Sequence, residues 1–462
     1  MAEPVGRLLA GLALALLVCA CGKPEDKNED KNADKPEDKN EGKDKAASPA
    51  AEKKPAASAP APSAPDREKL TARARELARR FVIMDGHIDV PDRLVKHLDA
   101  KGRPIEDVSK RTEEGDFDHP RAVEGGLDAP FMSIYVPSSH QKSGGARKKA
   151  DQLIDMVEQI AKGHPDKFAL AHSSAQVQEN SGKQLVSLPL GIENGAAIED
   201  ELRNLVHFHR RGVRYITLTH AEDNLICDSS YDDKKTWKGL SPFGRKVVAE
   251  MNRLGIMIDV SHISDQAFDQ VIELSQVPVI ASHSSARHFT PGWERNLDDD
   301  RIKALGAKGG VILINFGSSF INDRSRIYFD QMREALKKQT AGRKTPPSDE
   351  EREKLEDAYT AQHPPIFATV EQVADHVLRV IELAGVDHVG FGSDFDGVGD
   401  SLPEGLKDVS GYPNLIRALL ERGLSEADVE KICGGNFLRV WQAVEKHAER
   451  AAAGRSTAPT RN

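Results

Sequence analysis

From Asp66 onward, short apolar runs alternate with longer stretches that carry apolar residues at helical spacing. Eight of the short runs are rich in Val, Ile and Leu without strict alternation with polar residues, which is typical of strands covered on both faces. The predicted strands are Phe81–Met84, Phe131–Val136, Leu185–Ile192, Val213–Leu218, Ile256–Val260, Val277–Ala281, Val311–Phe316 and His388–Phe391.

The stretches between these runs carry signals for the starts and ends of helices. Ser241 followed by Pro242 predicts an N-cap and a first helical residue, and Gly255 predicts the end of the same helix. Thr369–Gln372 has the spacing of a capping box, and Ser425 is a further predicted N-cap. The apolar stripes of these helices predict packing in the core.

Strands and helices that alternate within one domain predict an α/β protein, a (β/α)8 barrel of the TIM type, over residues 66–450. The alternative is a doubly wound open sheet, but no Gly-x-Gly-x-x-Gly turn follows the first predicted strand and no Walker loop occurs. Gly317–Phe367 is long for a strand-to-helix connection, and a helix-start pattern begins within it at Ser348. We expect this segment to hold helices of its own and to act as a lid or a pocket wall.

The N-terminus has the pattern of a bacterial lipoprotein signal over residues 1–21. Leu8–Ala20 is an apolar run too short to span a bilayer, and Val18–Cys21 resembles a lipobox with Cys21 as the lipidated residue. The alternative is an ordinary secretory signal. Gly22 replaces the Asp that often marks inner-membrane retention. The prediction is a protein of the bacterial cell envelope, lipid-anchored on the outer membrane or facing the periplasm.

Two segments outside the predicted barrel have no apolar face to bury. Residues 22–65 are first rich in Lys, Glu and Asp and then in Ala and Pro, which predicts a disordered tether. Residues 451–462 predict a disordered tail. Within the barrel region the cysteines are Cys227 and Cys433, and the sequence leaves open whether they pair.

Composition narrows the classes of function. The 462 residues carry a formal net charge of −9 with a pI near 6.0, which argues against nucleic acid as a partner. No Cys-x-x-Cys pair occurs, so a structural zinc site of that type is excluded.

His and acidic residues follow the predicted strands at their carboxyl ends, which meet at the mouth of a barrel of this type. One such residue is more often a structural side chain or a helix cap, but seven of them at the ends of six strands favour a metal site. They are His87, Asp89, Glu193, His220, His262, His283 and Asp394.

The residue types indicate the metal and the reaction class. Imidazole together with carboxylate suits zinc, manganese or iron. Four His and three carboxylates exceed the needs of one catalytic zinc, so two metals bridged by a carboxylate are the more natural arrangement. A hydroxide that bridges two metals is a nucleophile near neutral pH, which predicts hydrolysis of an amide, an ester or a phosphoester.

The motifs around these residues carry a specific resemblance. They are Asp85–Pro91, Gly191–Gly195, Gly212–His220, Asp259–His262, Ser282–Ala286, Arg295–Asp299, Gly392–Gly397 and Gly434–Val440. In this order they resemble the renal (membrane) dipeptidase family of zinc metallopeptidases, over essentially the whole predicted barrel.

The resemblance implies two zinc ions in each chain and the hydrolysis of dipeptides. It implies that His87 and Asp89 hold one ion. His262 and His283 would hold the other, and Glu193 would bridge the two.

The remaining roles also come from the resemblance. His220 would contact the substrate and stabilise the oxyanion of the tetrahedral intermediate. Arg295 would bind the C-terminal carboxylate of the substrate, a task that suits its bidentate fork; without the motif, a surface salt bridge is the plainer interpretation. Asp394 would orient the attacking water, take its proton and meet the free amine of the substrate.

Ile88 and Asn194 depart from the family pattern, since many members have Asn and Gly at these positions. Neither is an expected ligand, so the departures bear on substrate choice. Two alternatives stay open: another binuclear barrel hydrolase, such as a deacylase, lactonase or phosphotriesterase, and a non-catalytic binding protein of the envelope. The sequence leaves open the preferred dipeptide and whether the chain is a monomer or a homodimer.

Overall fold

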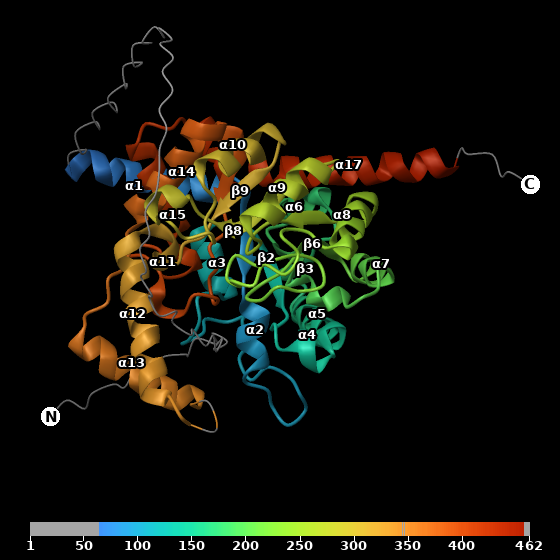
Figure 1. Cartoon of the computed structure of the whole chain (residues 1–462). Coiled ribbons are helices and arrows are strands. Elements are labelled where there is room, and N and C mark those ends of the chain that lie inside the picture. Colours follow the sequence, from blue (N-terminus) through green and yellow to red (C-terminus); the bar gives the residue numbers. More distant parts are fainter. Residues whose placement is uncertain (1–63, 344, 346, 457–462) are drawn as a thin grey trace, which may run out of the picture. The chain divides into compact units, whose positions relative to one another are not determined.

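Figure 1 shows the chain as a computed structural model in which residues 64–343, 345 and 347–456 are described. The predicted signal peptide with Cys21, the tether up to residue 63 and residues 457–462 lie outside the described residues. Predictions about these segments therefore stay predictions.

Eight parallel strands close into a barrel in the order β1-β10-β9-β8-β7-β6-β5-β2. The prediction of a (β/α)8 barrel is confirmed, because all eight apolar runs contribute a strand to its wall. The barrel strands are β1 (Ile83–Ile88), β2 (Leu127–Tyr135), β5 (Leu190–Glu193), β6 (Val213–Thr217), β7 (Met257–Asp259), β8 (Ile280–Ser284), β9 (Val311–Ile314) and β10 (Val389–Phe391).

One predicted strand is wrong as a single element. The run Leu185–Ile192 contains Pro189, which divides it into β4 (Val186–Leu188) and β5. β4 pairs with β3 (Phe168–Leu170) in a separate two-stranded sheet. Proline has no N–H to donate to a strand ladder, so it separates the two pieces.

Helices follow the strands and surround the barrel (Figure 1). They are α1 (Ala64–Arg80), α2 (Val90–Val95), α3 (His119–Gly125), α4 (His140–Ser143), α5 (Ala146–Gly163), α6 (Ser174–Gly182), α7 (Arg203–Arg210), α8 (Pro242–Leu254), α9 (Asp265–Leu274), α10 (Asp299–Ala307), α11 (Ser318–Ile321), α12 (Asp323–Thr340), α13 (Asp349–Gln362), α14 (Val370–Ala384), α15 (Tyr412–Glu421), α16 (Glu426–Glu430) and α17 (Asn436–Ser456). Among the described residues, no helix combines the length and the apolar character needed to cross a bilayer.

The predicted helix caps are confirmed. The Ser241 hydroxyl accepts from Gly244 N–H at the start of α8, and Gly255 ends that helix with a φ of 81°. Thr369 forms a capping box before α14, and Ser425 caps α16. These local signals act within one turn of chain, which is why the sequence alone shows them.

The long segment after β9 contains α11, α12 and α13, as expected. In Figure 1, α12 and α13 extend on the same side of the barrel as α2, which emerges from the carboxyl end of β1. A role of this segment as a lid or pocket wall stays a prediction.

The predicted tail begins too early. α17 continues to Ser456, so residues 451–456 are helical. Ala451–Ala453 are strong helix formers that prolong the preceding helix at no cost in propensity. Cys227 and Cys433 are both buried and unpaired.

An aromatic cluster fills the barrel beneath its mouth. The Phe131 ring lies 5.1 Å from Tyr215, 5.0 Å from Phe437 and 5.2 Å from Trp441, measured between ring centroids. All four side chains are buried. A Cβ at Gly191 would lie 2.0 Å from the Tyr215 ring, so glycine makes room for this tyrosine. The cluster forms a rigid floor for the residues above it.

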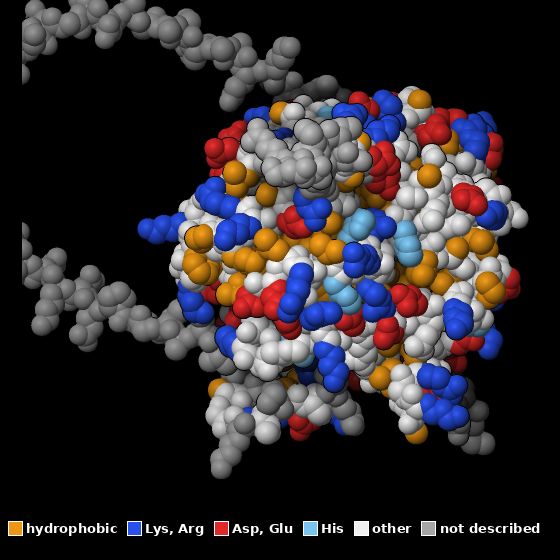
Figure 2. Space-filling model, turned by 90° about the vertical axis from the view of Figure 1, so that its right-hand side faces the viewer, with side chains coloured by type: hydrophobic (Ala, Val, Ile, Leu, Met, Phe, Trp, Pro, Cys, Tyr) orange, Lys and Arg blue, Asp and Glu red, His pale blue; other side chains and the backbone are white. Residues whose placement is uncertain are grey.

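The surface in Figure 2 mixes charges of both signs. On the described part of this face, Lys and Arg side chains are interspersed with Asp and Glu, and hydrophobic side chains lie between them. This face therefore offers no continuous basic surface of the kind that tracks a nucleic-acid backbone.

Candidate metal centre

The strand ends bring all seven predicted residues into one cluster. His87 and His283 lie within β1 and β8, Glu193 ends β5, and Asp89 follows β1 directly. His220, His262 and Asp394 each lie three residues beyond the end of a strand, namely β6, β7 and β10. All are buried except His220, whose side chain is 17% exposed.

Three overlapping groups in this cluster have the composition of metal sites. Within each group the candidate ligand atoms lie within 4.8 Å of one another. The groups are His87, Glu193 and His283; Glu193, His220 and His262; and His87, Asp89 and Asp394.

Glu193 lies between two sets of ligand atoms. Its Oε2 is 3.4 Å from His87 Nε2, which is itself 3.3 Å from Asp89 Oδ2. Its Oε1 is 3.1 Å from His262 Nε2 and 3.4 Å from His283 Nε2. Because each carboxylate oxygen faces a different set, one Glu193 side chain can serve two ions at once.

The His87 ring shows that a metal fits this pocket. Its Nδ1 is 2.8 Å from the Tyr215 hydroxyl, which fixes the ring from behind. Its Nε2 is buried and has no hydrogen-bond partner among the described residues. An imidazole nitrogen buried beside Asp89 and Glu193 without a hydrogen bond is the arrangement that a metal ion completes.

The electrostatics of the other imidazoles also suit a metal. Burial, with Arg295 nearby, holds the pKa of His262 and of His283 well below its usual value. Both rings are therefore neutral at pH 7 and keep a lone pair for an ion. Burial raises the pKa of Glu193, but the surrounding His87 and other imidazoles outweigh it and leave that pKa well below the ordinary value.

His87 behaves differently because carboxylates surround it. Burial lowers its pKa, but Tyr215, Asp89 and Glu193 together outweigh burial and raise the pKa well above the ordinary value. Without an ion, a proton supplies the positive charge that these carboxylates require. A divalent cation would supply two positive charges in place of the one that the proton carries.

Asp394 is poised to exchange a proton. Burial raises its pKa to about 7, and the nearby Asp89 and Glu193 add to this effect. The Asn315 side-chain amide donates to Asp394 Oδ2 at 2.7 Å. A Cβ at Gly397 would lie 2.3 Å from Asp394 Oδ1 and from Asp89 Oδ2, so only glycine lets this loop approach both carboxylates.

Arg295 is buried beside the metal cluster rather than on the surface, with only 2% of its area exposed. One terminal nitrogen donates to the Ser284 hydroxyl at 2.7 Å. The other donates to the carbonyl of His283 at 2.8 Å and lies 3.0 Å from His262 Nε2. A surface salt bridge is therefore the wrong interpretation of this residue.

The sequence profile of the membrane dipeptidase family (peptidase family M19) matches residues 71–455. The chain belongs to the membrane dipeptidase family. It is therefore a metallo-dipeptidase, a hydrolase whose activity depends on bound metal.

Two individual relatives are similar to this protein over most of its length. Dipeptidase tcpJ of Claviceps purpurea is 36% identical over 357 residues, which cover 75% of this chain and 72% of that protein. An uncharacterized dipeptidase of Schizosaccharomyces pombe is 32% identical over 385 residues, 81% of this chain and 83% of that protein.

Solved structures give the same assignment. The probable dipeptidase PvdM of Pseudomonas aeruginosa is 26% identical, with a TM-score of 0.70 over 82% of this chain and 100% of that chain. A metallopeptidase of Rhodobacter sphaeroides, liganded with a phosphinate mimic of the dipeptide L-Ala-D-Ala, is also 26% identical. Its TM-score is 0.63 over 79% of this chain and 99% of that chain.

Several residues that support the membrane dipeptidase site were not predicted from the sequence. Tyr135 packs edge-on against His220, with 5.0 Å between ring centroids. Tyr215 and Asn315 contact His87 and Asp394. The signal that could have found them is a polar side chain inside a predicted apolar strand, which Tyr135, Tyr215 and Asn315 all display.

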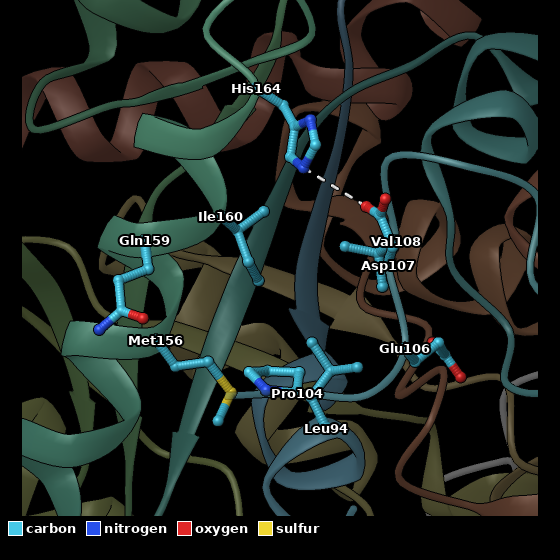
Figure 3. Close-up of a pocket in the computed structure, with 9 residues that line it drawn as sticks. All are labelled: Leu94, Pro104, Glu106, Asp107, Val108, Met156, Gln159, Ile160 and His164. Carbon is cyan, nitrogen blue, oxygen red and sulfur yellow. Dashed lines mark ion pairs between the residues drawn. The ribbon is translucent and has the colours of Figure 1, made fainter. Parts of the chain in front are cut away.

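A second hollow lies outside this cluster. It has a volume of about 190 Å³ and lies between α2, α5 and the loop from Pro104 to Val108 (Figure 3). Leu94, Met156 and Ile160 give it an apolar lining, and an ion pair of 3.4 Å between His164 and Asp107 lies at its edge. No residue of the metal cluster lines it.

Proposed function

We propose that the chain is a dipeptidase that uses two zinc ions, one held by His87 and Asp89 and the other by His262 and His283. The observation that carries this proposal is the position of Glu193, whose two oxygens face the two sets of ligands. When bound, zinc ions lower the pKa of water and polarise a carbonyl oxygen, which is the chemistry that peptide hydrolysis requires.

The protein residues around the metal sites supply the other steps. Asp394 takes the proton of the attacking water, because its carboxylate lies beside His87 and Asp89 and is held in place by the Asn315 amide, which donates to Oδ2 at 2.7 Å. His220 lies 3.5 Å from Glu193 Oε1 and donates to the carbonyl oxygen of the substrate as negative charge develops there.

Arg295 binds the C-terminal carboxylate of the dipeptide. One terminal nitrogen of Arg295 lies 3.0 Å from His262 Nε2, the atom that would bind the ion. With an ion on His262, this nitrogen would have one N–H available for the substrate and would keep its hydrogen bond to the carbonyl of His283. The positive charge of this arginine is buried, which strengthens its attraction for a carboxylate.

The substrate class follows from two buried side chains of opposite charge type in the cluster, Asp394 and Arg295. Asp394 can receive a free amine and Arg295 a free carboxylate, so the substrates are unblocked dipeptides. The phosphinate mimic of L-Ala-D-Ala bound by the Rhodobacter sphaeroides relative supports the inclusion of dipeptides with a D-residue in second position.

The test is a kinetic screen of L,L and L,D dipeptides with the purified protein, before and after chelation. We expect activity to disappear in chelator and to return with zinc, with two zinc ions for each chain by elemental analysis. Full activity in a metal-free protein would contradict the proposal. Turnover of esters or lactones without turnover of dipeptides would favour the alternative barrel hydrolase.

We further propose that the protein is anchored to the bacterial cell envelope through a lipid on Cys21. The lipobox-like Val18–Cys21 and the charged, Pro-rich tether support this proposal. The variant Cys21→Ser should leave the membrane fraction while the wild type stays in it. Equal distribution of both would contradict the anchor.

A further inference from the structure

His283 is contacted from behind by a chain of two side chains. The Ser282 hydroxyl oxygen lies 2.7 Å from His283 Nδ1. The same hydroxyl donates to Asp259 Oδ2 at 2.6 Å. All three side chains are essentially buried, with exposed fractions of 0 to 1%. Solvent therefore plays no part in deciding where their protons lie.

Asp259 receives hydrogen bonds on both oxygens. Its Oδ1 accepts from the backbone N–H groups of Ser261 at 3.0 Å and Ser282 at 2.8 Å. Its Oδ2 accepts from the Thr217 hydroxyl at 2.5 Å as well as from Ser282. An ionised carboxylate only accepts hydrogen bonds, and these four donors satisfy it.

The direction of these bonds fixes the proton on His283. The Ser282 hydroxyl has one proton, and it donates that proton in the hydrogen bond to Asp259 Oδ2. The Ser282 oxygen can then only accept a hydrogen bond from His283, so the ring carries its proton on Nδ1. This leaves a lone pair on Nε2, the atom that lies 3.4 Å from Glu193 Oε1 and 2.7 Å from His262 Nε2.

We propose that Asp259 and Ser282 are positioning residues that hold His283 in the tautomer required to bind a metal ion. The inference rests on the proposed metal site. It applies to one of the two ions, because His87 contacts Tyr215 instead and the Nδ1 of His262 has no hydrogen-bond partner among the described residues. We call the chain of contacts from Asp259 through Ser282 to His283 the relay. Loss of the relay should therefore weaken the binding of the ion held by His262 and His283.

Two variants break the relay in different ways. Ser282→Ala removes the hydroxyl and leaves His283 Nδ1 without a partner. Asp259→Asn does more, because its amide can donate to Ser282, which would then donate to His283 Nδ1 and move the ring proton to Nε2. The matched control is Thr217→Val, which removes the other hydroxyl donor to the same Asp259 oxygen without touching His283.

Zinc affinity, measured by competition with a chromogenic chelator, is the first readout. We expect Ser282→Ala to lower the affinity for one of the two zinc ions by about 10- to 100-fold. Asp259→Asn should lower the affinity for the same ion further. We expect Thr217→Val to change either affinity by no more than about twofold. The visible spectrum of the cobalt-loaded protein should change for one site only.

The outcomes separate the relay from general packing and from the proposed function. If the control loses as much zinc affinity as Ser282→Ala, or if both relay variants bind zinc like the wild type, the relay is wrong while the dipeptidase proposal stands. A wild type that binds no zinc contradicts the dipeptidase proposal. In that case ¹⁵N NMR of the metal-free protein still tests the relay. The His283 signal, assigned with His283→Gln, must show a proton on Nδ1 and not on Nε2.

Discussion

At the scale of single residues, the site depends on unusual backbone conformations. His262 and Asp394 have φ values of 68° and 64°, and Asn194 has 79°. Non-glycine residues pay an energy of order 1 kcal/mol in this left-handed region, and they concentrate at functional sites. The turns aim His262 and Asp394 back into the barrel mouth. The side chain of Asn194 stabilises its own turn, because Oδ1 accepts from Ala196 N–H at 3.0 Å and Nδ2 donates to the carbonyl of Val136 at 2.9 Å.

Arg295 allows a prediction at the same scale. Arg295→Lys keeps the charge but removes the fork that matches a carboxylate. We expect kcat/KM for a dipeptide to fall about 10- to 100-fold, mainly through KM. The corresponding dipeptide amide lacks the carboxylate and is the control substrate. The ratio of kcat/KM for acid over amide should therefore decrease in the variant; an unchanged ratio would show that Arg295 does not bind this group.

At the scale of elements, His376 joins three parts of the chain. It lies on α14 and accepts from Ala286 N–H at 3.0 Å through Nδ1. Its Nε2–H donates to the carbonyl of Ile321, at the end of α11, at 2.8 Å. Burial lowers the pKa of His376 to about 4. The neutral ring thus fixes the segment after β8 against the long insertion.

This histidine should make stability depend on pH. The folded pKa of about 4 lies below the unfolded value of 6.5, so between these values the unfolded chain binds more protons. The free energy of unfolding should therefore fall as the pH decreases from 6.5 to 4, by up to about 3 kcal/mol from this group. Denaturant titrations across this range should show a weaker dependence in His376→Gln than in the wild type. The exposed His97→Gln should follow the wild type, and an unaltered slope in His376→Gln would refute the assignment.

The strands also show which parts of the fold and of the site the sequence could predict. Apolar runs predicted all eight barrel strands, and the polar residues just beyond them predicted the ligand cluster, because strand direction alone brings these ends together. Pro189 was a local signal that the run of residues 185–192 could not stay one strand. The contacts of Asp259 with Ser282, and of Tyr215 with His87, depend on the register between different strands. No pattern along the chain specifies that register.

At the scale of the whole molecule, the metal centre draws on nearly the entire barrel. Its candidate ligands extend from His87 to Asp394 and come from strands on all sides of the closed sheet. Such a site exists only in the folded chain, so binding of ions is coupled to folding. If the ions are zinc, as proposed, the stability of the barrel should increase with the concentration of free zinc.

The slope of the free energy of unfolding against the logarithm of free zinc concentration depends on how many ions bind. Above the dissociation constant, each bound ion adds about 1.4 kcal/mol to the free energy of unfolding for every tenfold rise in free zinc. Two sites predict about 2.7 kcal/mol for each tenfold step, measured by denaturant titration in zinc buffers. Asp89→Asn, which removes a proposed ligand of one site only, should approach half this slope. A wild-type slope of about 1.4 kcal/mol would mean a single ion and would contradict the bridging role proposed for Glu193.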